Sequence, residues 1–350
     1  MSSVRTPTPG RSRVAAAAVA LALTAAAWGE ASASALGRNG PPPRYSGSEQ
    51  VPTGEHPGPS KSGFAGDRVN APTIAAQSRS FGQVAARAGV GLRTHKYSEL
   101  YGNASTLDVY TPRQFRGRHG QNVRTVILVH GGAWQMGDRI DLESRAVQLV
   151  KQLGVVAVSV NYRLATEAAW PAQRDDLNAA VSYVRKNAEQ LNVDTKRLVL
   201  LGSSAGGQIA ATVATYGSGK KRFRGLITLS GLLDPLLMTR KDPSYSNAVI
   251  PELLLRCLPA ECPERYESAT ALTQLDSRDP PSLLFHSRLE IPWDPSQARE
   301  FARASRGLGV SAQVVVLPGQ LHGIDAWAED WPTLRAWLRE RLGTKDRLAR

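Results

Sequence analysis

The stretch Gly202-Ser203-Ser204-Ala205-Gly206 follows an apolar run that ends at Leu201 and precedes a helical pattern. It has the form G-x-S-x-G, in which a serine stands at a sharp turn between a strand and a helix. Glycines flank the serine because such a turn leaves no room for side chains, and the turn pushes the hydroxyl outward. Ser204 is therefore the candidate nucleophile, whereas Ser203 occupies the wrong position in the pattern.

Short apolar runs alternate with helical stretches on both sides of this turn. Continuous runs rich in β-branched residues predict strands buried on both faces, and their alternation with helices predicts an α/β fold with a mostly parallel sheet flanked by helices. The predicted strands are 123–129, 155–160, 197–201, 225–229, 282–285 and 312–317. The predicted helices are 142–153, 175–187, 205–216, 296–307 and 327–342. Prolines within 232–280 break the rhythm and predict a small insertion over one end of the sheet.

A second glycine-rich stretch, His130-Gly131-Gly132-Ala133-Trp134, directly follows the predicted strand 123–129. A tetrahedral oxyanion needs backbone donors beside the nucleophile, and consecutive glycines allow the main chain to approach that closely. We therefore expect the N–H groups of Gly132, Ala133 and Ala205 to form an oxyanion hole. His130 precedes the nucleophile in the chain, so it is interpreted as a buried histidine that orders this loop.

A general base is expected after the nucleophile, and His322 follows the predicted strand 312–317. A carboxylate that orients the imidazole is expected between them, after the preceding strand. Glu290 and Asp294 both lie there, and the order serine, carboxylate, histidine is typical of hydrolases with this strand–turn–helix motif. Both carboxylates remain candidates on position alone.

Taken together, these motifs resemble the α/β-hydrolase fold over about residues 95–343. Within that fold they are similar to the carboxylesterase group with an H-G-G-x-W oxyanion loop, which includes acetyl-esterase-like and feruloyl-esterase-like enzymes, kynurenine formamidases and prenylcysteine methylesterases. The resemblance implies a serine hydrolase that cleaves a small-molecule carboxylic ester through an acyl-enzyme intermediate. It also implies that no metal or organic cofactor is needed, and that Tyr162 and Asp176 are structural.

One departure from the family concerns the acid. The family usually has H-G-x-x-D, where this chain has His286-Ser287-Arg288-Leu289-Glu290. Glutamate supplies the same carboxylate with one more methylene, so Glu290 is the preferred acid and Asp294 the alternative.

An amidase or formamidase of the same fold is an alternative function, and a non-catalytic binding protein on a hydrolase scaffold is another.

The N-terminal region has the pattern of an export signal. Basic side chains precede the apolar run 14–28, and small residues in A-x-A spacing follow it, which is typical of a secretory signal peptide over 1–35. Residues 36–80 are predicted to be a flexible Pro/Gly-rich linker, because 37–66 contain six prolines and seven glycines. The catalytic domain is expected over 81–350, in a secreted or extracytoplasmic protein; an uncleaved membrane anchor is the alternative.

The amino-acid composition and net charge exclude some classes of protein. Hydrophobic residues make up 42% of the 350 residues and charged residues 21%, which excludes a disordered polyelectrolyte. The net charge of +13 is spread along the chain, because residues 1–90 carry nine basic and four acidic side chains and the rest carry 34 and 26. We therefore expect no nucleic-acid partner.

Cys257 and Cys262 are equally compatible with a local disulfide and with two free thiols. The sequence leaves the oligomeric state open.

Overall fold

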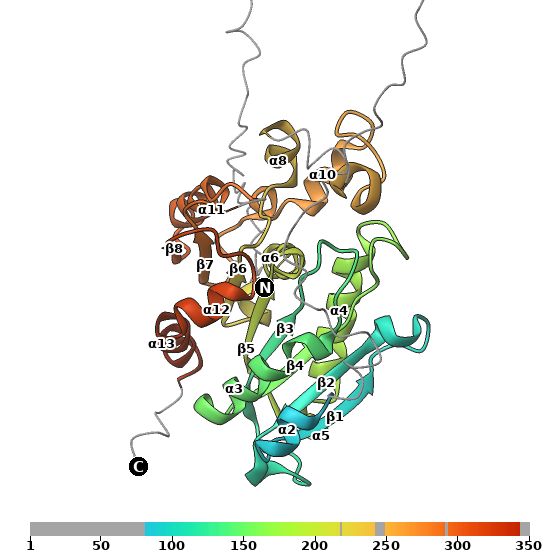
Figure 1. Ribbon diagram of the computed structural model, residues 1–350, viewed down its shortest axis with the longest axis vertical. Helices are drawn as coiled ribbons and strands as arrows, with labels where there is room; N and C mark the ends of the chain where they lie inside the picture. Colours follow the sequence, from blue (N-terminus) through green and yellow to red (C-terminus); the bar gives the residue numbers. More distant parts are fainter. Residues whose placement is uncertain (1–80, 218, 242–248, 291–292, 344–350) are drawn as a thin grey trace, which may run out of the picture. The chain divides into compact units, whose positions relative to one another are not determined.

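Eight strands form one sheet in the order β1-β2-β4-β3-β5-β6-β7-β8 (Figure 1). Neighbouring strands from β4 to β8 in that order are parallel, whereas β2 pairs antiparallel with both β1 and β4. The strands are β1 (Gly91–Lys96), β2 (Thr106–Thr111), β3 (Val123–Val129), β4 (Val156–Val160), β5 (Val193–Ser203), β6 (Gly225–Leu229), β7 (Ser282–Ser287) and β8 (Ala312–Leu317).

The computed structural model describes residues 81–217, 219–241, 249–290 and 293–343. They belong to one unit of the chain, Val69–Arg350. The predicted signal peptide (1–35) and linker (36–80) lie outside the described residues. None of the helices in the described part is long and apolar enough to cross a lipid bilayer.

Helices cover both faces of the sheet because successive strand residues point to opposite sides. Ile127, Val158, Leu200, Leu226 and Leu284 face one core, and Val126, Ala157, Val199, Ile227 and Leu283 face the other. The first core is covered by α4 (Ala172–Lys186), α6 (Ala205–Thr215) and α11 (Ser296–Gly307), and the second by α2 (Gln83–Arg87), α3 (Glu143–Leu153), α12 (Asp325–Glu329) and α13 (Trp331–Leu342). The described residues also form the short segments η1 (Gly102–Ser105), η2 (Arg113–Phe115), η3 (Arg139–Leu142), α5 (Ala188–Leu191) and α7 (Gly219–Arg222).

All six predicted strands lie in the sheet, which confirms the mostly parallel α/β class. The structure differs from expectation in two respects. The edge strand β1 and its neighbour β2 are additional, and the predicted helix 327–342 is divided into α12 and α13. The division occurs because Asp330 caps a new helix by accepting a hydrogen bond from the Thr333 N–H, with Pro332 in its first turn.

The expected insertion follows β6 and contains α8 (Pro235–Lys241), η4 (Val249–Leu254), α10 (Pro263–Ala269) and η5 (Ala271–Gln274). Figure 1 shows α8 and α10 beyond the end of the sheet at which β6 ends. Cys257 and Cys262, between η4 and α10, form a disulfide with their Cα atoms 6.2 Å apart. This bond closes a short loop within the insertion.

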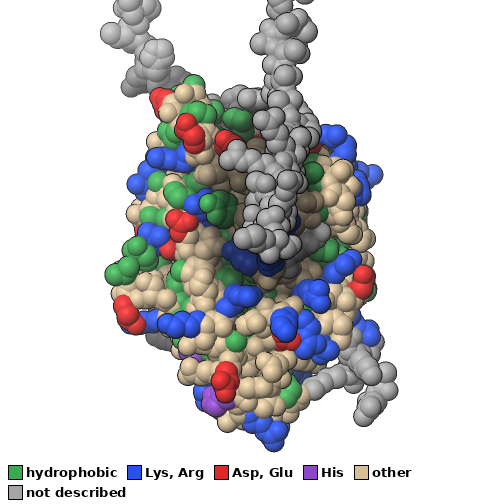
Figure 2. All heavy atoms as spheres, turned by 180° about the vertical axis from the view of Figure 1, so that it is seen from behind, with side chains coloured by type: hydrophobic (Ala, Val, Ile, Leu, Met, Phe, Trp, Pro, Cys, Tyr) green, Lys and Arg blue, Asp and Glu red, His purple; other side chains and the backbone are tan. Residues whose placement is uncertain are grey.

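Lys and Arg side chains are spread over the face that Figure 2 shows, with Asp, Glu and apolar side chains among them. The basic side chains on this face are therefore interspersed with acidic and apolar ones.

Candidate active site

Ser204 stands in the turn between β5 and α6 with φ 52° and ψ −119°. This left-handed backbone is rare for a residue with a side chain, and it is held by the bond from the Ser204 N–H to the Leu229 carbonyl, 2.8 Å long. A Cβ at Gly202 would lie 2.1 Å from the Gly206 carbonyl oxygen, and one at Gly206 would lie 2.3 Å from the His130 carbonyl oxygen. Both glycines are therefore required by the close approach of the backbone.

Three of the predicted site residues meet at the carboxyl ends of β5, β7 and β8. The Ser204 hydroxyl lies 2.8 Å from His322 Nε2, and His322 Nδ1 lies 2.7 Å from Glu290 Oε1. The Glu290 side chain is fully buried, whereas 31% of the His322 side chain is exposed. Asp294 instead accepts a hydrogen bond from the Ser296 N–H, 2.7 Å away, at the start of α11.

The loop that carries His322 is tied to the loop after β6 and to the last residue of β7. The Gly323 N–H donates to Ser230 Oγ over 2.8 Å, and the Ser287 hydroxyl donates to the Leu321 carbonyl over 2.7 Å. These bonds flank the imidazole on both sides along the chain. The position of His322 therefore depends on neighbouring strand ends and not on its own loop alone.

Glu290 is ionised at neutral pH. Burial raises the pKa of its carboxyl group, but hydrogen bonds from His286, His322 and the Ser287 N–H outweigh this and lower the pKa to about 2. A carboxylate only accepts hydrogen bonds, so His322 Nδ1 carries a proton and Nε2 is free to accept from Ser204.

The loop after β3 packs directly against Ser204. A Cβ at Gly131 would lie 3.2 Å from the Ser204 Cβ. The next three residues all have positive φ: Gly132 114°, Ala133 50° and Trp134 60°. Within the described residues, the N–H groups of Gly132 and Ala133 donate to no acceptor, and the Ala205 N–H, at the first position of α6, has no partner inside its helix.

His130 supports the loop after β3 through contacts of its ring and its backbone carbonyl. Its ring stacks on Tyr162 with centroids 4.3 Å apart, and the Tyr162 hydroxyl donates to the His130 carbonyl over 3.0 Å. Burial lowers the pKa of the imidazole, and its Nδ1 lies 2.8 Å from the Gly131 carbonyl oxygen. A neutral, buried imidazole that bonds its own loop agrees with the structural interpretation of His130 and of Tyr162.

The sequence of this chain is similar to a known protein family and to known esterases. A family model described as BD-FAE matches residues 107–304, more than half of the chain. The chain belongs to the BD-FAE family. An esterase of Gibberella moniliformis is 26% identical over 229 residues, covering 61% of this chain and 71% of that protein. Carboxylesterase NlhH of Mycobacterium tuberculosis is 41% identical over 108 residues, which are 30% of this chain and 32% of the relative.

Solved structures share the fold of this BD-FAE member. A truncated carbohydrate esterase from gut microbiota superposes with a TM-score of 0.62 at 21% identity, covering 72% of this chain and 96% of that chain. The family match and the esterase relatives, together with this shared fold, confirm the expected resemblance to α/β-hydrolase esterases. Within the described residues, no group of three or more His, Cys, Asp or Glu side chains is placed to hold a metal ion.

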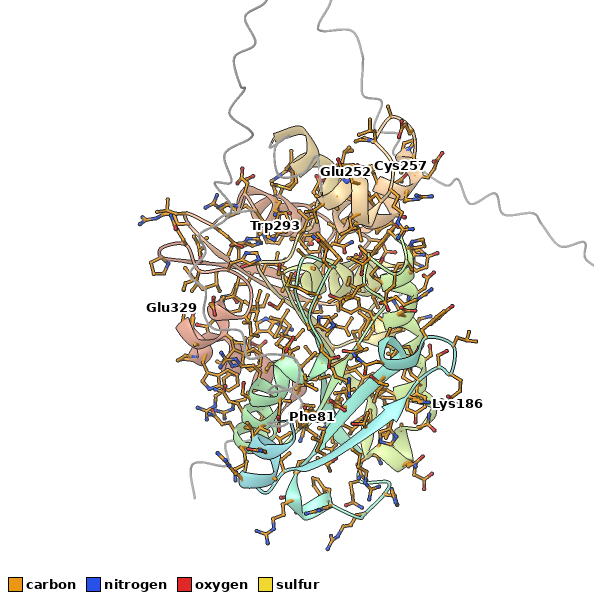
Figure 3. The ribbon with its side chains drawn as sticks, turned by 45° about the vertical axis from the view of Figure 1, so that its right-hand side comes forward. Phe81, Lys186, Glu252, Cys257, Trp293 and Glu329 are labelled. Atoms are coloured by element: carbon orange, nitrogen blue, oxygen red, sulfur yellow. A yellow bond between two sulfur atoms is a disulfide. The ribbon has the colours of Figure 1, made fainter. Side chains whose placement is uncertain are left out.

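Several side-chain contacts around Ser204 and His322 could not be predicted from the sequence. Trp134 donates its indole N–H to Gln208 in α6, and the carboxylate of Glu290 also contacts His286. Trp293 is buried 6.1 Å from the Trp134 ring and 6.2 Å from the His322 ring. Figure 3 shows Trp293 at the same end of the sheet as the insertion, where Glu252 and Cys257 are labelled. Only the folded chain brings these side chains together.

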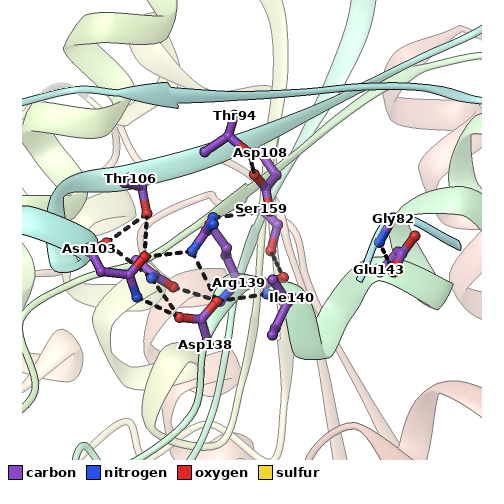
Figure 4. A network of polar contacts seen from close by, with 11 residues as sticks. Gly82, Thr94, Asn103, Thr106, Asp108, Asp138, Arg139, Ile140, Glu143 and Ser159 are labelled. Carbon is purple, nitrogen blue, oxygen red and sulfur yellow. Dashed lines mark hydrogen bonds and ion pairs between the residues drawn. The ribbon is translucent and has the colours of Figure 1, made fainter. Parts of the chain in front are cut away.

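A polar network anchors the far end of the loop after β3 (Figure 4). Arg139 Nε lies 3.0 Å from the buried carboxylate of Asp108, and its Nη1 donates to Asn103 over 2.9 Å. Asn161 accepts from the Arg139 N–H over 2.6 Å and donates to Asp138 over 2.9 Å. The network joins β2, η1, η3 and the residue that follows β4, and therefore fixes where the loop leaves the site.

Proposed function

We propose that this chain hydrolyses carboxylic esters through an acyl-enzyme intermediate, with Ser204 as nucleophile, His322 as general base and Glu290 as the orienting acid. The observation that carries the proposal is the unbroken series of hydrogen bonds from the Ser204 hydroxyl through His322 to Glu290. Membership of the BD-FAE family and similarity to esterases support it.

Acylation begins when His322 Nε2 accepts the proton of the Ser204 hydroxyl while Oγ attacks the carbonyl carbon of the ester. The carbonyl oxygen becomes an oxyanion, which the N–H groups of Gly132, Ala133 and Ala205 stabilise. The protonated imidazole then donates its proton to the leaving alkoxide, and the alcohol departs. The acyl group remains bonded to Ser204.

Deacylation uses the same groups with water as the nucleophile. His322 accepts a proton from the water as its oxygen attacks the acyl carbon, and the collapse of the second tetrahedral intermediate returns that proton to Ser204 Oγ. The carboxylic acid product is released. Throughout, the buried Glu290 carboxylate holds the Nδ1–H tautomer and stabilises the imidazolium that forms in each step.

The decisive experiment compares two adjacent serines. Ser204→Ala should reduce hydrolysis of p-nitrophenyl acetate by about a thousandfold or more and should abolish labelling by a fluorophosphonate probe. Ser203→Ala is the matched control, because Ser203 is the buried neighbour whose hydroxyl makes no hydrogen bond to His322 within the described residues. This variant should keep activity and labelling. Full activity in a folded Ser204→Ala protein would refute the proposal.

We also propose that the enzyme acts outside the cytoplasm. The Cys257–Cys262 disulfide supports this location, because disulfides persist in oxidising compartments. The N-terminal pattern over 1–35 predicts the export route. N-terminal sequencing of protein recovered from its native host should show a chain that begins after Ala33 or Ala35, whereas an intact N-terminus on cytosolic protein would contradict this.

A further inference from the structure

The carboxylate of Glu290 lies between two histidines. His322 Nδ1 is 2.7 Å from Oε1, and His286 Nδ1 is 3.0 Å from Oε2. The two histidines come from neighbouring strand ends, since His286 is the penultimate residue of β7 and His322 follows β8. Ser287 adds a backbone N–H, 3.0 Å from Oε2. Each carboxylate oxygen is therefore held by a different set of donors.

Within the described residues, the imidazole of His286 has one hydrogen-bond partner, the carboxylate of Glu290. The carboxylate of Glu290 only accepts hydrogen bonds, so the proton must reside on His286 Nδ1 and point toward Oε2. The other ring nitrogen, Nε2, is buried and has no hydrogen-bond partner within the described residues. The side chain of His286 is fully buried. Burying a polar atom without a partner is unfavourable. The hydrogen bond to Glu290 is therefore the interaction that compensates for burying an imidazole at this position.

The length of Glu290 explains why a second donor matters. Glutamate has one more rotatable bond than the aspartate usual in the family, so its carboxylate has more orientations that miss His322. The donors on Oε2 restrict those orientations, because they come from the strand end and from the backbone of β7. With Oε2 held in place, Oε1 faces His322.

We propose that His286 is a positioning residue, which holds the Glu290 carboxylate through Oε2 so that Oε1 accepts from His322. The inference rests on the proposed function, because the orientation of Glu290 matters for the rate only if His322 is the base. It assigns His286 no contact with substrate. Its effect on the reaction passes through Glu290 and His322.

The kinetic test compares variants that keep or lose the N–H. In His286→Asn the amide nitrogen is bonded to Cγ, as Nδ1 is in histidine, and it keeps a donor near the same place. His286→Leu and His286→Phe fill the buried site without any donor, and two such variants are made because one of them could fail to fold. The donorless variants should lower kcat for p-nitrophenyl acetate roughly 10- to 100-fold with KM changed less than about twofold. His286→Asn should recover most of the loss.

A second readout does not depend on activity. Long-range proton–nitrogen NMR of protein labelled at histidine should show His286 as the Nδ1–H tautomer, with its signals identified by their absence in His286→Leu. Finding the Nε2–H tautomer overturns the proposal whatever the kinetics. An active wild type whose folded donorless variants keep full kcat overturns the positioning role alone. A folded wild type with the Nδ1–H tautomer but no hydrolysis refutes the proposed function, and the role of His286 in it falls as well.

Discussion

The indole N–H of Trp134 donates a hydrogen bond to Gln208 Oε1 across 3.1 Å, and both side chains are fully buried. Gln208 Nε2 in turn donates to the Ala269 carbonyl at the end of α10, 2.8 Å away. One amide group therefore links the proposed oxyanion loop, the helix that follows Ser204 and the insertion. The position of Ser204 relative to the proposed oxyanion donors depends on this link.

Replacing Gln208 by Leu should reduce both stability and rate. The buried Trp134 N–H and Ala269 carbonyl would each lose a partner, which costs about 1 to 3 kcal/mol in the free energy of unfolding per unpaired group. We also expect kcat to fall, because the loop is no longer tied to α6. Urea unfolding and ester kinetics check both effects. Gln173→Leu is the control, since Gln173 is equally buried but donates to the Arg163 and Ala168 carbonyls; an equal loss of kcat there would argue against a specific link.

Gly206→Ala should destabilise the protein by about 3 kcal/mol or prevent folding. The added Cβ would lie 2.3 Å from the His130 carbonyl oxygen and 2.4 Å from that of Val129, and neither backbone group yields easily. Gly307→Ala, at the end of α11, is the control because nothing lies within 4 Å of its Cβ position. That variant should be neutral or slightly more stable. Thermal unfolding of both proteins measures the difference.

Glu290 should make stability depend on pH in the acid range. Its pKa is about 2 in the folded protein, below the unperturbed value of 4.5, so the unfolded chain binds the proton more readily. The contribution to stability is therefore complete above about pH 4.5 and is lost as the pH falls toward 2. It amounts to about 3 kcal/mol. Denaturant unfolding should show Glu290→Gln losing less stability than wild type between pH 5 and pH 2.5; equal losses would contradict the prediction.

The two carboxylates after β7 should differ sharply in their effect on the rate. Glu290→Gln leaves His322 without its anionic partner, and we expect kcat to fall by about a thousandfold or more. Asp294→Asn should change kcat less than about tenfold, because Asp294 accepts from the Ser296 N–H instead. Ester kinetics on the two purified variants measure the two losses of kcat. A larger loss in Asp294→Asn than in Glu290→Gln would identify Asp294 as the acid.

Removing the disulfide should lower stability without removing activity. Replacing both Cys257 and Cys262 by Ala frees a short loop in the unfolded chain, which costs about 2 kcal/mol by loop entropy. The midpoint of thermal unfolding should fall in the variant and in wild type treated with a reductant, and reductant should not affect the variant further. An unchanged midpoint in both cases would show that the bond contributes nothing to global stability.

Much of the fold could be predicted because buried parallel strands are continuous apolar runs. The runs of β3 and β4 pack between helices, so most residues in them are apolar. The edge strand β1 and its neighbour β2 could not be predicted in this way. Strand β1 is half exposed, and β2 buries Asp108 against Arg139 of η3. Their burial follows from partners elsewhere in the chain.

The sequence by itself determined the strand–turn–helix motif at Ser204 and the glycine loop after His130, because such turns admit only residues without a side chain at the crowded positions. Only the tertiary structure decided between Glu290 and Asp294 as the neighbour of His322, and whether Cys257 pairs with Cys262. These contacts depend on how strand ends and loops far apart in sequence come to lie beside one another. Local propensity carries no information on that placement, which the packing of the whole sheet sets.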